Sequence, residues 1–130
     1  VAVVALSGIG GTARWAAMQL REQGVKAGVV RPRVYRPFPK AQMVDILKKA
    51  KAVAVVERAA SPGAPGSPLF SDLCTAMFDL PARPKMVNYV TGLGGRDTSS
   101  AMFASVFKRL QEIATGGELG PVVSYLGARE

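Results

Sequence analysis

The sequence predicts an α/β fold, a three-layer sandwich in which helices cover both faces of a mostly parallel sheet of four or five strands. Strand-like and helix-like segments alternate along the 130 residues, and the strand-like segments are apolar throughout. Continuous apolar strands are typical of a parallel sheet that is buried on both faces. Crossovers in such a sheet are expected to be right-handed. The length corresponds to one domain with a core of its own.

The first elements are two strands separated by a helix. Residues 1–6 are an apolar run followed by glycines, which predicts a buried strand. In residues 12–23 apolar side chains recur at i, i+3, i+4 and i+7, so we expect a helix there. Residues 25–31 form the second predicted strand. The prolines of residues 31–39 end it, because proline has no N–H to donate to a sheet.

The middle of the chain repeats this alternation. Helical spacing predicts helices over residues 40–51 and 70–77. Between them lie a strand over residues 52–56 and a loop rich in proline and glycine over residues 59–68.

The last elements are a strand over residues 85–90, a glycine turn over residues 91–97 and a helix that Ser99 caps. Residues 121–126 are either a final strand or an arm that reaches a partner.

We expect a domain over residues 1–115 and a C-terminal extension or arm over residues 116–130. Because the first residue is not methionine and already lies in a strand-like run, we expect a fragment of a larger protein or a processed subunit.

Composition excludes several kinds of chemistry. The chain has no histidine and a single cysteine, Cys74. Its own residues therefore cannot form a Ser-His-Asp or Cys-His site, a zinc site or an iron–sulfur cluster. We expect no catalytic residue and no metal site in this chain. A lone cysteine suits a reducing compartment, and neither a signal peptide nor an apolar run of ~20 residues is visible, so we expect a cytoplasmic protein without membrane contact.

Positive charge is concentrated in the first part of the chain. Residues 1–51 contain ten basic and two acidic residues, whereas residues 52–130 contain seven of each, so the net charge of +8 lies in the first segment. A basic surface attracts phosphates, nucleic acids or acidic proteins. We expect no nucleic-acid partner, because aromatic residues are few (7%) and no nucleic-acid-binding motif is present.

The turn after the first strand, with Gly8, Gly10 and Gly11, contains the pattern G-x-G-x-x-A. In a dinucleotide-binding fold such glycines let a pyrophosphate approach backbone N–H groups at a helix N-terminus. Arg31 or Arg33, at the end of the second strand, would then favour a 2′-phosphate and hence NADP. The alternative is a tight turn that needs small residues for packing.

Residues 31–39 combine three arginines with three prolines. Proline stiffens the loop, so Arg31, Arg33 and Arg36 can be oriented with little ordering cost. We expect this loop to contact a phosphate or carboxylate, or to lie in a subunit interface together with Phe38. The alternative is a solvated basic loop in which Phe38 covers the core.

Two more unusual loops follow the third and fourth strands. In a parallel sheet, loops that follow strands meet at one edge, where α/β domains bind their ligands. Glycine-rich turns can also expose N–H groups to an anion. Arg96 and Asp97 could alternatively pair with each other. The interface or anion-contact candidates in these loops are Arg58, Gly92, Gly94, Gly95, Arg96 and Asp97.

Five strings occur in order and together resemble one family. They are residues 31–39 (RPRVYRPFP), 53–58 (VAVVER), 61–63 (SPG), 66–70 (GSPLF) and 92–97 (GLGGRD). The set resembles the C-terminal domain of the α subunit of pyruvate:ferredoxin oxidoreductase and related 2-oxoacid:ferredoxin oxidoreductases. The resemblance begins at the first residue, and Glu57 replaces an expected aspartate.

This resemblance implies a fold like the transketolase C-terminal domain and a place in a larger enzyme of EC 1.2.7 type. Such enzymes oxidatively decarboxylate a 2-oxoacid to an acyl-CoA, using thiamine diphosphate, magnesium, iron–sulfur clusters and coenzyme A, with ferredoxin as electron acceptor. In the family, other domains hold the diphosphate and magnesium. The resemblance therefore implies a non-catalytic structural or interface domain, inactive alone, whose partners are the other domains or subunits.

Two alternatives from other classes remain. One is an NADP-type dinucleotide-binding module that uses Gly8, Gly10 and Gly11. The other is a basic docking domain for an acidic partner such as ferredoxin.

Overall fold

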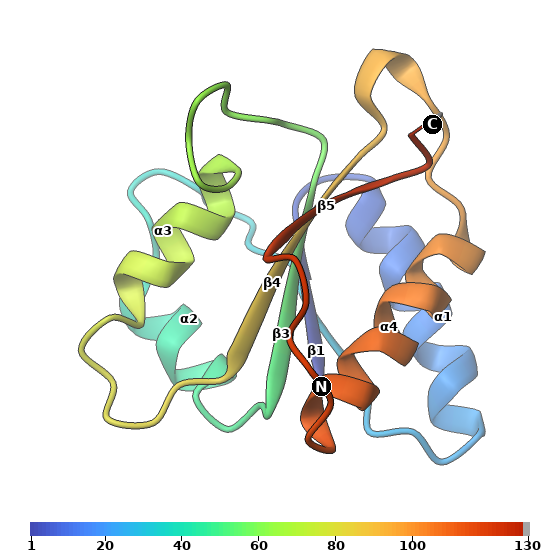
Figure 1. Cartoon of the computed structure of the whole chain (residues 1–130), viewed down its shortest axis with the longest axis horizontal. Helices are drawn as coiled ribbons and strands as arrows, with labels where there is room; N and C mark the ends of the chain where they lie inside the picture. The colour runs from blue at the N-terminus through green and yellow to red at the C-terminus, as the bar shows by residue number, and fades with distance from the viewer. Residues whose placement is uncertain (129–130) are drawn as a thin grey trace.

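A computed structural model describes residues 1–128 of the chain. Within these residues five parallel strands form one sheet in the order β2-β1-β3-β4-β5. Helices cover both of its faces, which confirms the predicted three-layer α/β fold (Figure 1). In chain order the elements are β1 (Ala2–Ala5), α1 (Ile9–Glu22), β2 (Gly28–Val30), α2 (Lys40–Leu47), β3 (Ala52–Glu57), α3 (Pro68–Ala76), β4 (Lys85–Thr91), the 3₁₀ turn η1 (Leu93–Gly95), α4 (Ser100–Ala114) and β5 (Val123–Leu126).

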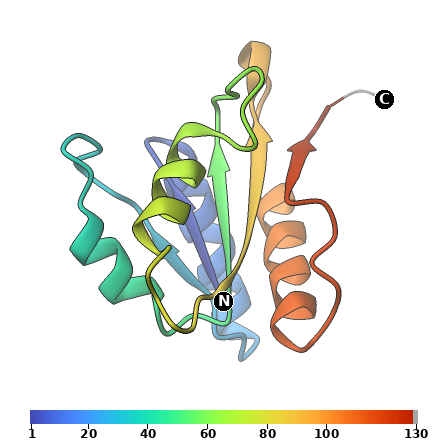
Figure 2. The ribbon, with the colours of Figure 1, turned by 60° about the vertical axis from the view of Figure 1, so that its left-hand side comes forward.

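Each face of the sheet has its own hydrophobic core. Helices α1 and α4 pack on one face, and α2 and α3 pack on the other (Figure 2). Val3 and Ala5 of β1 belong to the first core, whereas Ala2 and Val4 belong to the second. Successive residues of a strand point to opposite faces, so burial on both faces explains why every residue of β1 is apolar.

One crossover departs from the expected hand. Helix α4 connects β4 to β5, yet it lies on the same face as α1, which connects β1 to β2 in the opposite direction along the sheet (Figure 1). The β4-α4-β5 crossover is therefore left-handed, whereas the other three are right-handed. A right-handed connection would place α4 beside α2 and α3, leaving α1 alone on the opposite face. Burial of Phe103 and Phe107 on that face outweighs the usual preference.

The first helix begins earlier than predicted. It starts at Ile9 rather than residue 12, so Gly10 and Gly11 are helical. The turn is made instead by Ser7 and Gly8, and Ser7 has a positive φ of 55°. Glycine is tolerated in a first helical turn, where few intrahelical hydrogen bonds depend on it. Gly10 and Gly11 therefore belong to α1, and not to the turn that the sequence predicted.

The C-terminal tail contributes a strand. β5 pairs in parallel with β4, from Val123 beside Asn88 to Leu126 beside Thr91. Of the two alternatives for residues 121–126, the structure has the strand. The edges of the sheet are thus formed by β2 and β5.

Candidate functional site

The carboxyl edge of the sheet carries a cleft of about 390 Å³. The strand order reverses direction at β1, so the loops after β1 and β3 leave toward opposite faces, and a crevice is expected between them. The cleft brings together three of the four predicted loops. It is lined by Ser7, Gly8, Ile9, Thr12, Arg58, Gly95, Arg96, Asp97 and Thr98.

The turn that enters the cleft is constrained. A positive φ is uncommon for a residue other than glycine and occurs in turns that the surrounding structure holds in place. At Ser7 two backbone bonds accompany it: Gly10 N–H donates to the Ser7 carbonyl at 3.3 Å, and Gly11 N–H donates to the Gly8 carbonyl at 2.9 Å. Ser7 is the residue of this turn that carries a hydroxyl, and a serine hydroxyl acts as a nucleophile only when a neighbouring base removes its proton. Asp97 is the one carboxylate that lines the cleft.

Charged groups of the cleft bond mainly to the backbone. Arg58 Nη2 donates to the Gly92 carbonyl at 3.2 Å, and Arg96 Nη1 donates to the Gly127 carbonyl. Asp97 Oδ1 accepts from Thr98 N–H at 2.9 Å. The ion pair between Arg96 and Asp97, an alternative from the sequence, is not among the ion pairs of residues 1–128. Each of the two side chains bonds to a backbone group instead.

Glycines in the turn after β4 adopt conformations that suit glycine. Gly92, Gly94 and Gly95 have φ values of 68°, 66° and 79°. A Cβ on Gly92 would also lie 2.7 Å from Arg58 Nε. Gly92 therefore permits both the tight turn and the close approach of the guanidinium.

A buried polar network underlies this edge. The carboxylate of Glu57, 5% exposed, accepts hydrogen bonds from the N–H groups of Leu69 and Phe70 at 3.0 and 3.1 Å, and from the Ser67 hydroxyl. Asn88 Oδ1 accepts from Ser67 N–H at 2.9 Å, and Asn88 Nδ2 donates to the Val55 carbonyl at 3.1 Å. Glu57 thus satisfies the N-terminus of α3, and the network joins β3, β4 and α3.

The proline–arginine loop is anchored on α3. Asp72 accepts a hydrogen bond from the Tyr35 hydroxyl at 2.7 Å and forms an ion pair with Arg36 at 2.8 Å. The Arg36 guanidinium also lies 4.0 Å from the centre of the Tyr35 ring. Burial, followed by the hydrogen bond to Asp72, raises the pKa of Tyr35. Phe38 packs against the second core and meets Tyr35 edge-on, with ring centres 6.4 Å apart.

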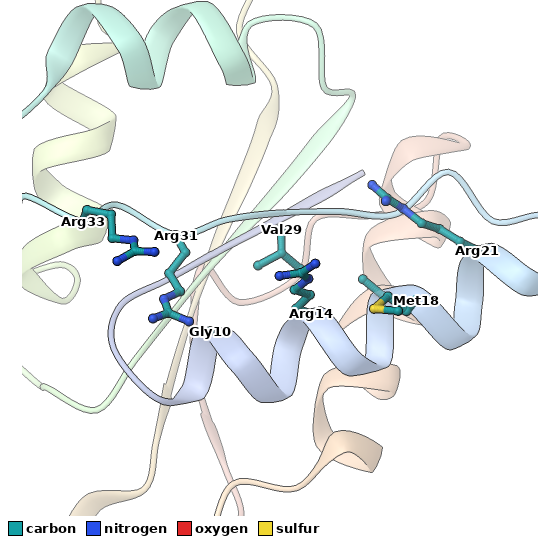
Figure 3. Close-up of a pocket in the computed structure, with 8 residues that line it drawn as sticks. Gly10, Arg14, Met18, Arg21, Val29, Arg31 and Arg33 are labelled. Atoms are coloured by element: carbon teal, nitrogen blue, oxygen red, sulfur yellow. The ribbon is translucent and has the colours of Figure 1, made fainter.

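The other two arginines of that loop face a different surface. Arg31 and Arg33 line a groove of about 510 Å³ between α1 and the chain that leaves β2 (Figure 3). Arg14 and Arg21 of α1 contribute two more guanidiniums. We call this the arginine groove; its lining residues are Gly10, Arg14, Ala17, Met18, Arg21, Val29, Arg31 and Arg33.

Gly10 has a packing role in this groove. A Cβ at this position would lie 2.7 Å from Arg31 Cδ, 3.0 Å from Arg31 Cγ and 3.2 Å from the Ala5 carbonyl oxygen. The absent side chain lets the stem of Arg31 lie across the start of α1. This contact favours the small-residue interpretation of the glycine pattern at Gly10, whereas a Cβ on Gly8 or Gly11 would meet no atom within 4 Å.

Residues 1–128 contain neither a cluster of metal-ligating side chains nor a membrane-spanning helix. No group of three or more His, Cys, Asp or Glu side chains lies close enough together there to hold a metal ion. No helix of this part of the chain has the length and apolar character needed to cross a membrane. Burial raises the pKa of the Cys74 thiol, and a single thiol does not suit an iron–sulfur cluster.

Sequence reasoning missed Arg14, Arg21 and the buried network. The signal for the arginines was present, because Gly10, Arg14 and Arg21 share one face of a helix at spacings of four and seven residues. The network gave no comparable local signal. Its members approach one another only when β3, β4 and α3 assemble.

Comparison with known proteins assigns the family. The model of pyruvate:ferredoxin oxidoreductase core domain II matches residues 1–103. The chain belongs to this family. Subunit PorA of pyruvate synthase from Thermotoga maritima is 36% identical over 128 residues, which are 98% of this chain and 32% of that relative. Subunit VorA of ketoisovalerate oxidoreductase from Pyrococcus abyssi is 35% identical over 115 residues, which are 88% of this chain and 29% of that relative.

The chain thus spans about a third of the length of these curated relatives. A solved structure described as a split gene transketolase, inactive beta4 tetramer, matches with a TM-score of 0.64. It is 18% identical, and the match covers 87% of this chain and 38% of that one. At this identity the likeness concerns the fold alone, and it confirms the transketolase-like architecture expected from the sequence.

Proposed function

We propose that the chain is a non-catalytic interface domain of a thiamine-diphosphate-dependent 2-oxoacid:ferredoxin oxidoreductase. The observation that carries this proposal is the family match over residues 1–103 in a chain without histidine. Relatives are named for pyruvate synthase and ketoisovalerate oxidoreductase, so the proposed substrate of the whole enzyme is a short 2-oxoacid. Thiamine diphosphate, magnesium, iron–sulfur clusters and coenzyme A would be held by other parts of a cytoplasmic enzyme that passes electrons to ferredoxin.

The role proposed for this chain is to hold neighbouring domains in position. The carboxyl edge suits that role because its turns are fixed internally: Glu57 caps α3, and Arg58 bonds to Gly92. A rigid surface loses little entropy when it docks. The proposed contact residues at this edge are Arg58, Gly92, Gly94, Gly95, Arg96 and Asp97.

Enzyme reconstitution tests the proposal. The isolated chain should not reduce a viologen dye with pyruvate or 2-oxoisovalerate and coenzyme A. The complete enzyme should do so, and the enzyme that lacks this domain should lose both assembly and turnover. Turnover by the isolated chain would overturn the proposal, as would full activity and normal assembly of the enzyme without the domain.

A further inference from the structure

All the charged residues that line the arginine groove are arginines. Four arginines, Arg14, Arg21, Arg31 and Arg33, line one groove of about 510 Å³ that follows α1, with Arg31 and Arg33 by the start of the helix and Arg21 at its other end (Figure 3). The groove lies at the β2 edge of the sheet, beyond which residues 1–128 place no further strand. Arg14 and Arg21 belong to α1, and Arg31 and Arg33 belong to the segment after β2, so Arg14 and Arg31 bring charge to the groove from two separate elements.

Within residues 1–128 these charges are not neutralised by neighbouring carboxylates. No ion pair involves Arg14, Arg31 or Arg33, whereas Arg36 pairs with Asp72 and Arg109 pairs with Glu112. The Nε–H group of Arg21 donates a hydrogen bond to the carbonyl oxygen of Ala27 at 2.5 Å, and this carbonyl carries no net charge. Like charges that share a space repel one another, and a bound anion relieves that repulsion.

The shape and chemistry of the groove indicate the class of anion. A planar guanidinium binds phosphate oxygens in pairs, so several of them favour more than one phosphoryl group. Ala17, Met18 and Val29 add apolar surface that can contact an uncharged part of the ligand. The volume lies within the range of small-molecule sites, about 300–1,000 Å³. Concave sites of this size are typical of small-molecule binding.

We infer that the arginine groove binds a small organic molecule with two or more phosphoryl groups, such as a nucleoside polyphosphate or a phosphorylated dinucleotide. Arg14 and Arg31 would contact the phosphates. This inference does not rest on the proposed function, because it depends only on the groove.

Titration of the 130-residue chain tests this inference. Tripolyphosphate serves as the first probe, and calorimetry measures its binding. The only tryptophan, Trp15, is 57% exposed and adjoins Arg14, so its fluorescence gives a second readout. Saturable binding is expected, with affinity lowered at least about tenfold by Arg31→Gln and by Arg14→Gln, the loss of one charge-assisted contact each. Arg83→Gln removes an exposed cation outside the groove and should leave the affinity unchanged.

Further titrations identify which kind of phosphorylated molecule the groove prefers. ATP, coenzyme A, NADPH and NADH are titrated separately, and a preference for NADPH over NADH would indicate a 2′-phosphate. The inference is overturned if tripolyphosphate and all four molecules fail to saturate at millimolar concentration. It is also overturned if Arg83→Gln weakens binding as much as Arg31→Gln, which would indicate nonspecific attraction. Binding of polyglutamate that tripolyphosphate cannot displace would assign the groove to an acidic protein instead.

Discussion

Replacing Glu57 with glutamine should destabilise the fold although the new side chain has nearly the same shape. The carboxylate accepts from the N–H groups of Leu69 and Phe70 and from the Ser67 hydroxyl. Glutamine offers one oxygen and one NH₂, so a backbone N–H at the start of α3 faces a donor and stays unsatisfied. A buried unsatisfied donor costs about 1–3 kcal/mol. Loss of a negative charge at a helix N-terminus adds about 0.3–1 kcal/mol.

The expected loss for Glu57→Gln is therefore about 1–4 kcal/mol in the free energy of unfolding. Urea unfolding followed by circular dichroism measures it, with the slope of the transition unchanged. Glu112→Gln is the matched control, because it makes the same change in an exposed pair with Arg109 and should cost no more than about 0.5 kcal/mol. Equal stability of Glu57→Gln and the wild-type chain would refute the assigned role of the carboxylate.

Three further predictions concern packing and reactivity. Gly11→Ala should stabilise the chain by up to about 1 kcal/mol, because no atom lies within 4 Å of the new Cβ. Gly10→Ala should not stabilise the chain in this way, because its Cβ would lie 2.7 Å from Arg31 Cδ. If urea unfolding showed the same increase in stability for both variants, this packing at Gly10 would be contradicted. Burial raises the pKa of Cys74, so iodoacetamide should modify the folded chain more slowly than the denatured chain at mildly alkaline pH, and equal rates would disprove the burial effect. Phe107→Ala removes a fully buried ring and should cost about 3–5 kcal/mol, measured by urea unfolding; a loss below about 1 kcal/mol would be inconsistent with this core.

The strands and most helices could be predicted from the sequence because their signals are local. A short apolar run that ends at a glycine turn or at charged residues has few other stable placements, and β1 and β3 match such runs. The start of α1 could not be predicted in the same way. Gly10 suggests a loop by its local preference, but its reason for being glycine is the stem of Arg31, which follows twenty-one residues later.

The hand of the last crossover and the partners in the site also lie beyond local reasoning. The position of α4 depends on which face the other helices leave uncovered, a property of the whole sheet. The sequence did predict that loops following strands would meet at one edge. It did not predict that Arg96 would bond to Gly127 rather than to Asp97, because that contact requires β5 to lie beside β4.

Two surfaces of the chain therefore suit different kinds of contact. Open α/β sheets usually bind ligands at the carboxyl edge. Here Arg58 and Arg96 of that edge bond to backbone carbonyls, and the Glu57 carboxylate beneath it is fully engaged with α3. The hydrogen bonds of Arg58 and Arg96 therefore hold the carboxyl edge in a fixed shape, which suits docking of a neighbouring domain. In the arginine groove Arg14 and Arg31 retain charges without an acidic partner in residues 1–128, so an anion gains more there than at the carboxyl edge.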